Sequence, residues 1–333
     1  MSSCLQKRAE FVSEQTKGKR KLQNWFQKKR NIVLGAVICT FLWGCAFPAV
    51  KLGYQIFSID SDDVASQMLF AGIRFFTAGI VTLLIAAVSQ RKFPGIPRHY
   101  VPGTVLLGIV QTALQYLCFY VGLAHTTGTR GSILNATSTF MTIILVGIVW
   151  PKKEPITLRK LLGCIIGLGG VVLVNLSGLS TSQPFTFLGE GMVLLSALCL
   201  SLSALLTKVL SKGTNPLSLT GWHLTTGGFL LLICGLLSGG KLENVGWQGI
   251  LLLAFMVLIS SVAFPIWTFL LKYNPVSKIS VYNFLIPVFG VILSSLVLGE
   301  GFPGISCILA LLLVCAGIIL VNREKKPESK QAG

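Results

Sequence analysis

"AGIRFFTAGI" (residues 71–80) decides the fold, because a second stretch of the chain repeats its pattern. This segment aligns with "TGWHLTTGGF" (220–229), which places Gly72 over Gly221, Thr77 over Thr226 and Gly79 over Gly228. Further along, "IVWPKKEPIT" (148–157) aligns with "SSLVLGEGFP" (294–303), and "GVVLVN" (170–175) aligns with "GIILVN" (317–322). All three alignments need nearly the same shift along the chain. The sequence therefore contains two copies of one unit.

The repeated unit is strongly apolar. Of the 333 residues, 53% are hydrophobic and 12% are charged, whereas a soluble domain carries about 25% charged residues. The apolar runs are each long enough to cross the roughly 30 Å hydrocarbon core as a helix. The expected spans are 32–53, 68–90, 102–124, 129–150, 158–177, 186–208, 217–238, 246–271, 276–298 and 303–322. The first run is too long for a signal-peptide core, so we expect it to remain as the first span.

The spans divide equally between the two copies. Each copy then holds five spans, and because five is odd, the second copy enters the membrane inverted relative to the first. We therefore expect an all-α integral membrane protein with ten transmembrane helices, built as two inverted five-helix repeats. The expected repeats are 32–177 and 186–322, flanked by cytoplasmic tails at 1–31 and 323–333. Inverted repeats are typical of transporters, because two such halves can open a midplane site to either side.

The charge distribution predicts the orientation. The net charge is +17, and Lys and Arg gather in the tails and in alternate loops, whereas "SIDSDD" (58–63) on the opposite side carries three aspartates. This asymmetry places both termini in the cytoplasm and indicates a multi-pass protein of the plasma membrane. The basic residues are explained by orientation and by contact with anionic headgroups of the bilayer, so we expect no nucleic-acid partner. "KRKLQNWFQKKR" (19–30) fits a surface-bound amphipathic segment or a solvated tail.

The reactive side chains form no chemical site. The nine cysteines show no metal-binding spacing, and nearly all lie within spans, so we expect neither disulfides nor a metal. His99, His125 and His223 are scattered and lack a Ser, Cys or Asp partner. We therefore expect no enzyme activity and no cofactor. A homodimer is compatible with this architecture, but no sequence feature indicates one.

Two further stretches carry a family resemblance. "WGCAFPAVK" (43–51) and "NFLIPVFGVILSSLVLGE" (283–300), with Arg74 early in the second span, resemble the EamA-type family of the drug/metabolite transporter superfamily. The resemblance covers about residues 32 to 322, although the first copy departs from it, with Met141 in place of the proline found at Pro287. It implies a ten-helix inverted-repeat carrier of small metabolites, often an exporter of amino acids or related compounds. Within its motifs we expect structural roles for Gly44, Glu154, Pro287 and Glu300.

Two cations lie within the spans. Lys51 is placed roughly 28 Å along the first helix, near the outer face. There it could snorkel to the headgroups or face a cavity. Arg74 enters the second span from the same side, and the two together would favour an anionic group such as a carboxylate. In the repeat Arg74 aligns with His223, which fits either a hydrogen-bonded histidine of the bundle or a pH-sensitive ligand.

Aromatic and amide side chains within spans complete the candidate cavity. A polar atom without a partner is costly at such depth, so each amide either bonds between helices or lines water. The Trp residues near span ends also fit an interfacial belt. With Lys51 and Arg74, the substrate-binding candidates are Trp43, Phe47, Gln115, Tyr116, Asn135, Trp222, His223, Trp267, Tyr282 and Asn283.

These observations predict a secondary transporter of small organic metabolites that works by alternating access. No ATP-binding motif is present, and no Asp or Glu lies at the centre of a span, which weakens coupling to protons through a midplane carboxylate. A facilitator, an exchanger, or coupling through His223 fits better. The alternatives are a membrane-embedded enzyme acting on lipid or acyl donors, and a sensor or structural membrane protein that transports nothing.

Overall fold

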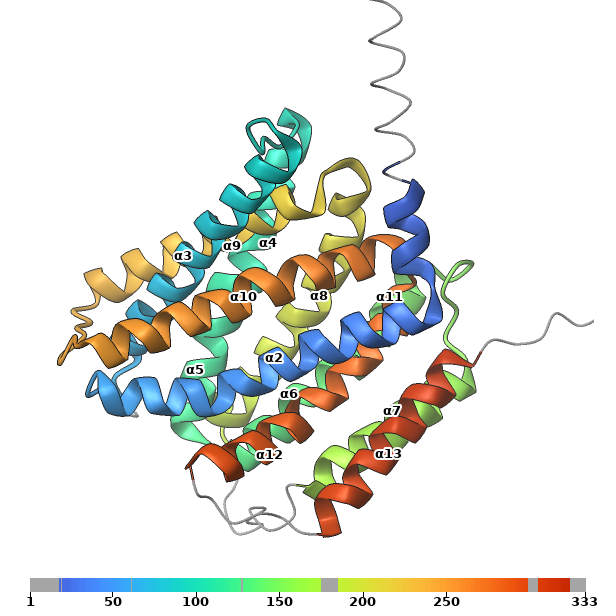
Figure 1. The fold of residues 1–333 in the computed structure, drawn as a ribbon. Helices are drawn as coiled ribbons and strands as arrows, with labels where there is room; N and C mark the ends of the chain where they lie inside the picture. Colours follow the sequence, from blue (N-terminus) through green and yellow to red (C-terminus); the bar gives the residue numbers. More distant parts are fainter. Residues whose placement is uncertain are drawn as a thin grey trace, which may run out of the picture.

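The computed structural model describes residues 18, 20–60, 62–126, 128–174, 185–298 and 305–323, and this part of the chain contains helices and no strands. Expectations for Glu300, and for most of both tails, fall outside these residues. Figure 1 shows the helices in chain order. Their bounds are α2 (Lys29–Ile56), α3 (Val64–Gln90), the 3₁₀-helix η1 (Arg98–Tyr100), α4 (Val101–Gly108), the π-helix η2 (Ile109–Leu114), α5 (Gln115–His125), α6 (Gly128–Val149), α7 (Leu158–Val174), the π-helix η4 (Phe187–Gly191), α8 (Met192–Gly213), α9 (Pro216–Leu237), α10 (Trp247–Tyr273), α11 (Val276–Ser280), the 3₁₀-helix η5 (Val281–Phe284), α12 (Leu285–Leu298) and α13 (Ile305–Asn322).

Seven helical segments in the described chain are long and apolar enough to cross a membrane. Some of them join two or more of the helices named above. They are Lys29–Ile56, Val64–Gln90, Arg98–Gly122, Phe187–Gly213, Pro216–Leu237, Trp247–Tyr273 and Val276–Val297. Ile133–Val149 and Ile308–Asn322 are apolar but shorter. The all-helical, multi-pass membrane fold is thus confirmed, while the count of ten spans stays a prediction.

The aligned glycines of the repeat pack α3 against α9. A Cβ on Gly72 would collide with the backbone of Leu232, and a Cβ on the aligned Gly221 would lie 2.7 Å from the side chain of Leu83. Likewise, a Cβ on Gly79 would collide with Thr225, and one on Gly228 with Phe76. As the residue number rises along α3, the number of its partner falls along α9. The two helices therefore run antiparallel, with aligned residues making aligned contacts, as a two-fold axis between them requires.

The other helices show the same correspondence between the two repeats. α7 and α13 lie side by side at one flank of the bundle, and α3 with α9 lies at the opposite flank (Figure 1). Between them α2 packs on α10 and α12, and α8, which corresponds to α2, packs on α5 and α6. The contact of α3 with α10 has its counterpart in the contact of α9 with α4. A two-repeat architecture fits these pairings.

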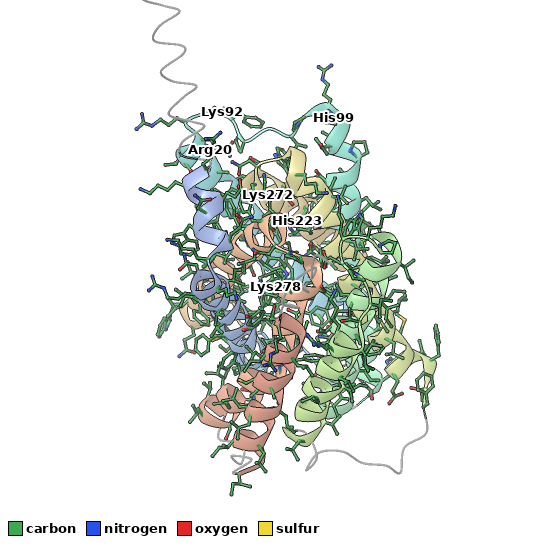
Figure 2. The ribbon with its side chains drawn as sticks, turned by 90° about the vertical axis from the view of Figure 1, so that its right-hand side faces the viewer. Arg20, Lys92, His99, His223, Lys272 and Lys278 are labelled. Carbon is green, nitrogen blue, oxygen red and sulfur yellow. The ribbon has the colours of Figure 1, made fainter. Side chains whose placement is uncertain are left out.

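The segment before α2 contributes one residue to the protein core. Residues 20–27 are helical, and Phe26 is buried, with its ring stacked on Phe269 at a centroid distance of 4.9 Å. The amide of Asn274 also donates to the Phe26 carbonyl oxygen at 3.0 Å. Neither interpretation of residues 19–30 predicted this contact, because the sequence pattern does not show which residue an aromatic side chain packs against. Arg20, Lys92 and His99 lie at one end of the bundle (Figure 2).

Candidate functional site

A cavity of about 720 Å³ lies between the helices. Its walls come from α2, α3, η2, α5 and α6 on one side of the repeat boundary, and from α8, α10, α11, η5 and α12 on the other. Its volume falls within the roughly 300–1,000 Å³ typical of small-molecule sites. Both copies of the repeat therefore contribute to one site.

Most of the sequence-derived candidates meet at this cavity. Nine of the twelve substrate-binding candidates line it, and Pro287 does so as well. The nine are Trp43, Phe47, Lys51, Arg74, Gln115, Tyr116, Asn135, Trp267 and Asn283. They come from segments far apart in the sequence and are brought together by the packing of α2 with α10 and α12.

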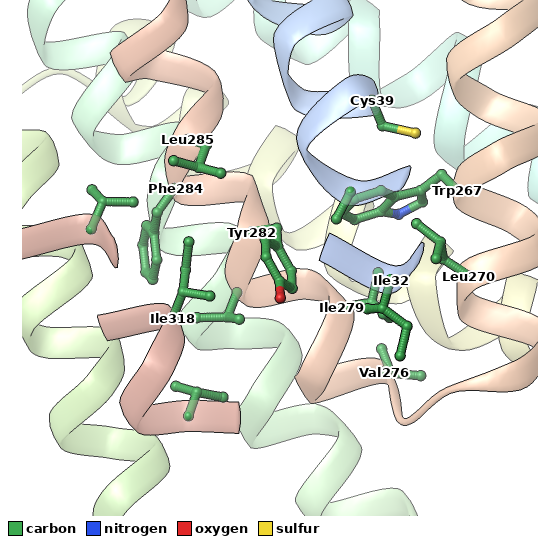
Figure 3. Packing of buried hydrophobic residues seen from close by; sticks show 14 of the residues in the cluster. Ile32, Cys39, Trp267, Leu270, Val276, Ile279, Tyr282, Phe284, Leu285 and Ile318 are labelled. Atoms are coloured by element: carbon green, nitrogen blue, oxygen red, sulfur yellow. The ribbon is translucent and has the colours of Figure 1, made fainter. Parts of the chain in front are cut away.

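Three candidates lie away from the cavity. The Trp222 indole Nε1 donates to the Pro94 carbonyl oxygen at 2.9 Å, which ties α9 to the loop after α3. His223 is buried, and its backbone carbonyl faces Gly108. Tyr282 packs in the hydrophobic cluster around Ile279 and Phe284 (Figure 3). The structure thus places these three residues outside the lining of this cavity.

Arg74 is the charged group inside the cavity. Its side chain is only 3% exposed, its Nε donates to Ser260 Oγ at 3.1 Å, and its guanidinium carbon lies 4.8 Å from the centre of the Phe75 ring. Ser260 in turn donates to the Met256 carbonyl oxygen, so the hydroxyl is oriented to accept from Arg74. These contacts hold one edge of the guanidinium. Among the described residues, none accepts a hydrogen bond from the Nη groups, which can therefore bind a solute.

Lys51 lines the cavity near the C-terminal end of α2. Its side chain is exposed, and α2 continues beyond it to Ile56. Toward the opposite end, the lining residues Thr207, Leu271 and Ser280 are all buried. The cavity is thus exposed at the Lys51 end and covered at the other.

Several buried polar atoms in the cavity wall have no partner in the described part of the chain. They are Trp43 Nε1, Gln111 Oε1, Asn135 Oδ1, Ser280 Oγ and Asn283 Oδ1. Leaving such a group unsatisfied costs about 1–3 kcal/mol. Donors and acceptors that remain unpaired against a cavity are suited to bind water or a polar solute.

Sequence reasoning missed part of the lining, including Tyr54, Gln67, Gln111, Tyr120, Ser138 and Thr142. Gln111 and Gln115 both line the cavity, and their four-residue spacing places them on one face of the segment formed by η2 and α5. Gln115 Nε2 also donates to Ser196 Oγ of α8 at 3.0 Å. A spacing of three or four residues links Asn135, Ser138 and Thr142 along α6. That spacing was a usable signal.

A polar network covers the closed end. The Glu154 carboxylate accepts hydrogen bonds from the Val276 and Ser277 backbone N–H groups at 2.9 Å, and from Ser277 Oγ at 2.7 Å. The Lys208 ammonium donates to the carbonyl oxygens of Leu271 and Asn274. Glu154 thus accepts from the backbone N–H groups at the start of α11, and Lys208 donates to the carbonyl oxygens at the end of α10. Together they stabilise the turn between these two helices.

Two further motif residues, Gly44 and Pro287, lie where α2 meets α12 and near the start of α12. A Cβ on Gly44 would lie 2.6 Å from Phe289 Cβ, so glycine is needed where α2 meets α12. Pro287 lies one turn into α12, after η5, where its missing N–H disrupts little. Within the described residues, no three His, Cys, Asp or Glu side chains cluster to hold a metal.

Comparisons with known proteins agree with this architecture. A family model described as the EamA-like transporter family matches the chain twice, over residues 30–176 and 187–323. The chain is 26% identical to the uncharacterized transporter YoaV of Bacillus subtilis, covering 87% of this chain and 96% of the relative. It is 24% identical to the chloroplastic WAT1-related protein At3g02690 of Arabidopsis thaliana, covering 85% and 67%. A crystal structure with 15% sequence identity superimposes with a TM-score of 0.72 and covers 88% of this chain and 98% of its own.

Proposed function

The chain belongs to the EamA-like transporter family, and from this premise we propose that it is a secondary transporter that moves small organic solutes across the plasma membrane by alternating access. The observation that carries the proposal is the cavity between the two copies of the repeat, whose largely apolar and aromatic wall holds the buried cation of Arg74. Relatives named as transporters support the transport class.

The solute in this proposal carries a carboxylate. Arg74 and Lys51 supply positive charge, and an ionisable group within a span usually marks a substrate path. The resemblance to metabolite exporters favours outward movement of amino acids or related compounds. The sequence contains no ATP-binding motif, so gradients of solute or ions would drive the cycle.

The two copies would act as the moving halves. We propose repeats at 32–177 and 186–322, and the two family matches support these bounds. The network of Glu154 and Lys208 would close the cytoplasmic end while the Lys51 end is open. The basic residues at the closed end support cytoplasmic termini (Figure 2).

Counterflow in proteoliposomes tests this function. Vesicles loaded with a mixed panel of unlabelled metabolites are diluted into trace labelled solutes, with and without a pH gradient. The protein is expected to accelerate uptake of at least one carboxylate-bearing solute over protein-free vesicles. If no solute of the panel exchanges while the protein is folded and inserted, the transport proposal is wrong.

A further inference from the structure

We infer that the transported solute is an aromatic carboxylate anion that lacks an ammonium group. This inference rests on the proposed transport function and specifies which of the carboxylate-bearing compounds fits the cavity. Three features carry it: the aromatic walls, the sign of the charges in the lining, and the position of Arg74 beside those walls.

Aromatic rings form much of the cavity wall. Trp43 lies edge-on to Trp267 and Phe264, with ring centroids 5.0 and 5.4 Å apart. On α5, Tyr116 and Tyr120 also face the cavity, with centroids 6.0 Å apart. Aromatic pairs are favoured in offset or edge-to-face geometry, so such walls suit a planar ring on the solute.

The charges in the lining have one sign. Lys51 and Arg74 line the cavity, and none of the described lining residues is Asp or Glu. An ammonium group entering this space meets two cations and no carboxylate. Aromatic faces alone attract cations, but that attraction is weaker than the repulsion that the buried Arg74 guanidinium exerts on a second cation close to it. The cavity therefore favours an anion over a zwitterion, and a zwitterion over a cation.

Arg74 adjoins the aromatic wall. Its guanidinium lies against Phe75, whose ring is 4.4 Å from Tyr116 and 6.2 Å from Phe264 between centroids. If the Nη groups bound the carboxylate of a solute, an aromatic ring joined to that carboxylate by a short linker could contact Tyr116 and Phe264. Bidentate pairing with carboxylates is the geometry that guanidinium groups favour.

The unpartnered atoms of the wall add a second preference. Trp43 Nε1 is only a donor, and it is buried without a partner among the described residues. A neutral oxygen on the ring could accept from it. A hydroxyl-substituted aromatic carboxylate is therefore expected to bind more tightly than the unsubstituted one.

Four solutes of one skeleton test the inference. They are 3-phenylpropanoate, phenylalanine, 3-phenylpropylamine and 3-cyclohexylpropanoate, measured by calorimetry on the purified full chain and by counterflow in proteoliposomes. We expect 3-phenylpropanoate to bind at least tenfold more tightly than phenylalanine and 3-cyclohexylpropanoate, and the amine not to exchange. Arg74→Gln is expected to remove the preference for the anion, whereas Lys92→Ala, an exposed cation outside the cavity, leaves it unchanged.

The outcomes separate the two claims. If phenylalanine or the amine binds and exchanges as well as 3-phenylpropanoate, the inference is wrong and the transport function stands. The same holds if none of the four exchanges while another solute of the mixed metabolite panel does. Failure of every solute in both panels overturns the proposed function together with the inference.

Discussion

Replacing Arg74 by glutamine is expected to lower the affinity for a carboxylate solute by about ten- to 150-fold. A hydrogen bond to a charged group contributes about 1.5–3 kcal/mol, and each 1.4 kcal/mol corresponds to a factor of ten. Arg74 is buried in the cavity wall and its Nε is bonded to Ser260 Oγ, so the substitution removes an oriented cation from the site. Concentration-dependent counterflow measures the change.

Two variants make this result interpretable. Arg74→Lys keeps the charge but loses the planar guanidinium, so we expect an intermediate loss. Lys92→Ala removes an exposed cation and is expected to transport as the wild type does. Wild-type kinetics in Arg74→Gln, from a variant that elutes as a single species, would remove Arg74 from the site.

Replacing Gly79 by leucine is expected to prevent the two halves from packing. Even a Cβ at this position would collide with the backbone and hydroxyl of Thr225, where α3 packs on α9. Overpacking a core costs about 1–3 kcal/mol when side chains can adjust, and here the obstacle is backbone, so the loss is expected to reach or exceed the upper value. Thermal unfolding and size-exclusion profiles in detergent report the effect.

A matched glycine controls for the mutation itself. Gly169 of α7 is exposed, and a Cβ there would meet no atom within 4 Å, so Gly169→Leu is expected to melt and elute as the wild type does. Gly228→Leu, the counterpart of Gly79 in the repeat, should be as damaging as Gly79→Leu. Normal folding of Gly79→Leu would contradict the packing of α3 on α9.

The repeat in the sequence predicted most of the fold. Gly72 and Gly79 aligned with Gly221 and Gly228, and all four glycines lie at close contacts between α3 and α9. The alignment succeeded because small residues are needed wherever two helices approach closely, in both copies alike. The turn geometry of η2 and η5 was not predicted, since a single π or 3₁₀ turn leaves no periodic signal in an apolar run.

The site was predictable in part. Trp43, Phe47 and Lys51 follow from one motif on α2, and all three reach the cavity. Trp222 and His223 fall outside this lining, and α9 has no one-sided apolar stripe that would identify its inner face from the sequence. The partners of these residues, Pro94 and Gly108, lie far away in the sequence and are set only by tertiary packing.

Labelling a single cysteine in the cavity from each side of the membrane tests the central claim most directly. Ala204 lines the cavity from α8, toward the closed end, and Ala204→Cys is a small change in a variant whose native cysteines are replaced and which still transports. If the site opens alternately, an impermeant thiol reagent reacts with this cysteine in both right-side-out and inside-out vesicles, and a transported solute slows both reactions. Reaction from one side only, in a protein that catalyses counterflow, would contradict alternating access through this cavity.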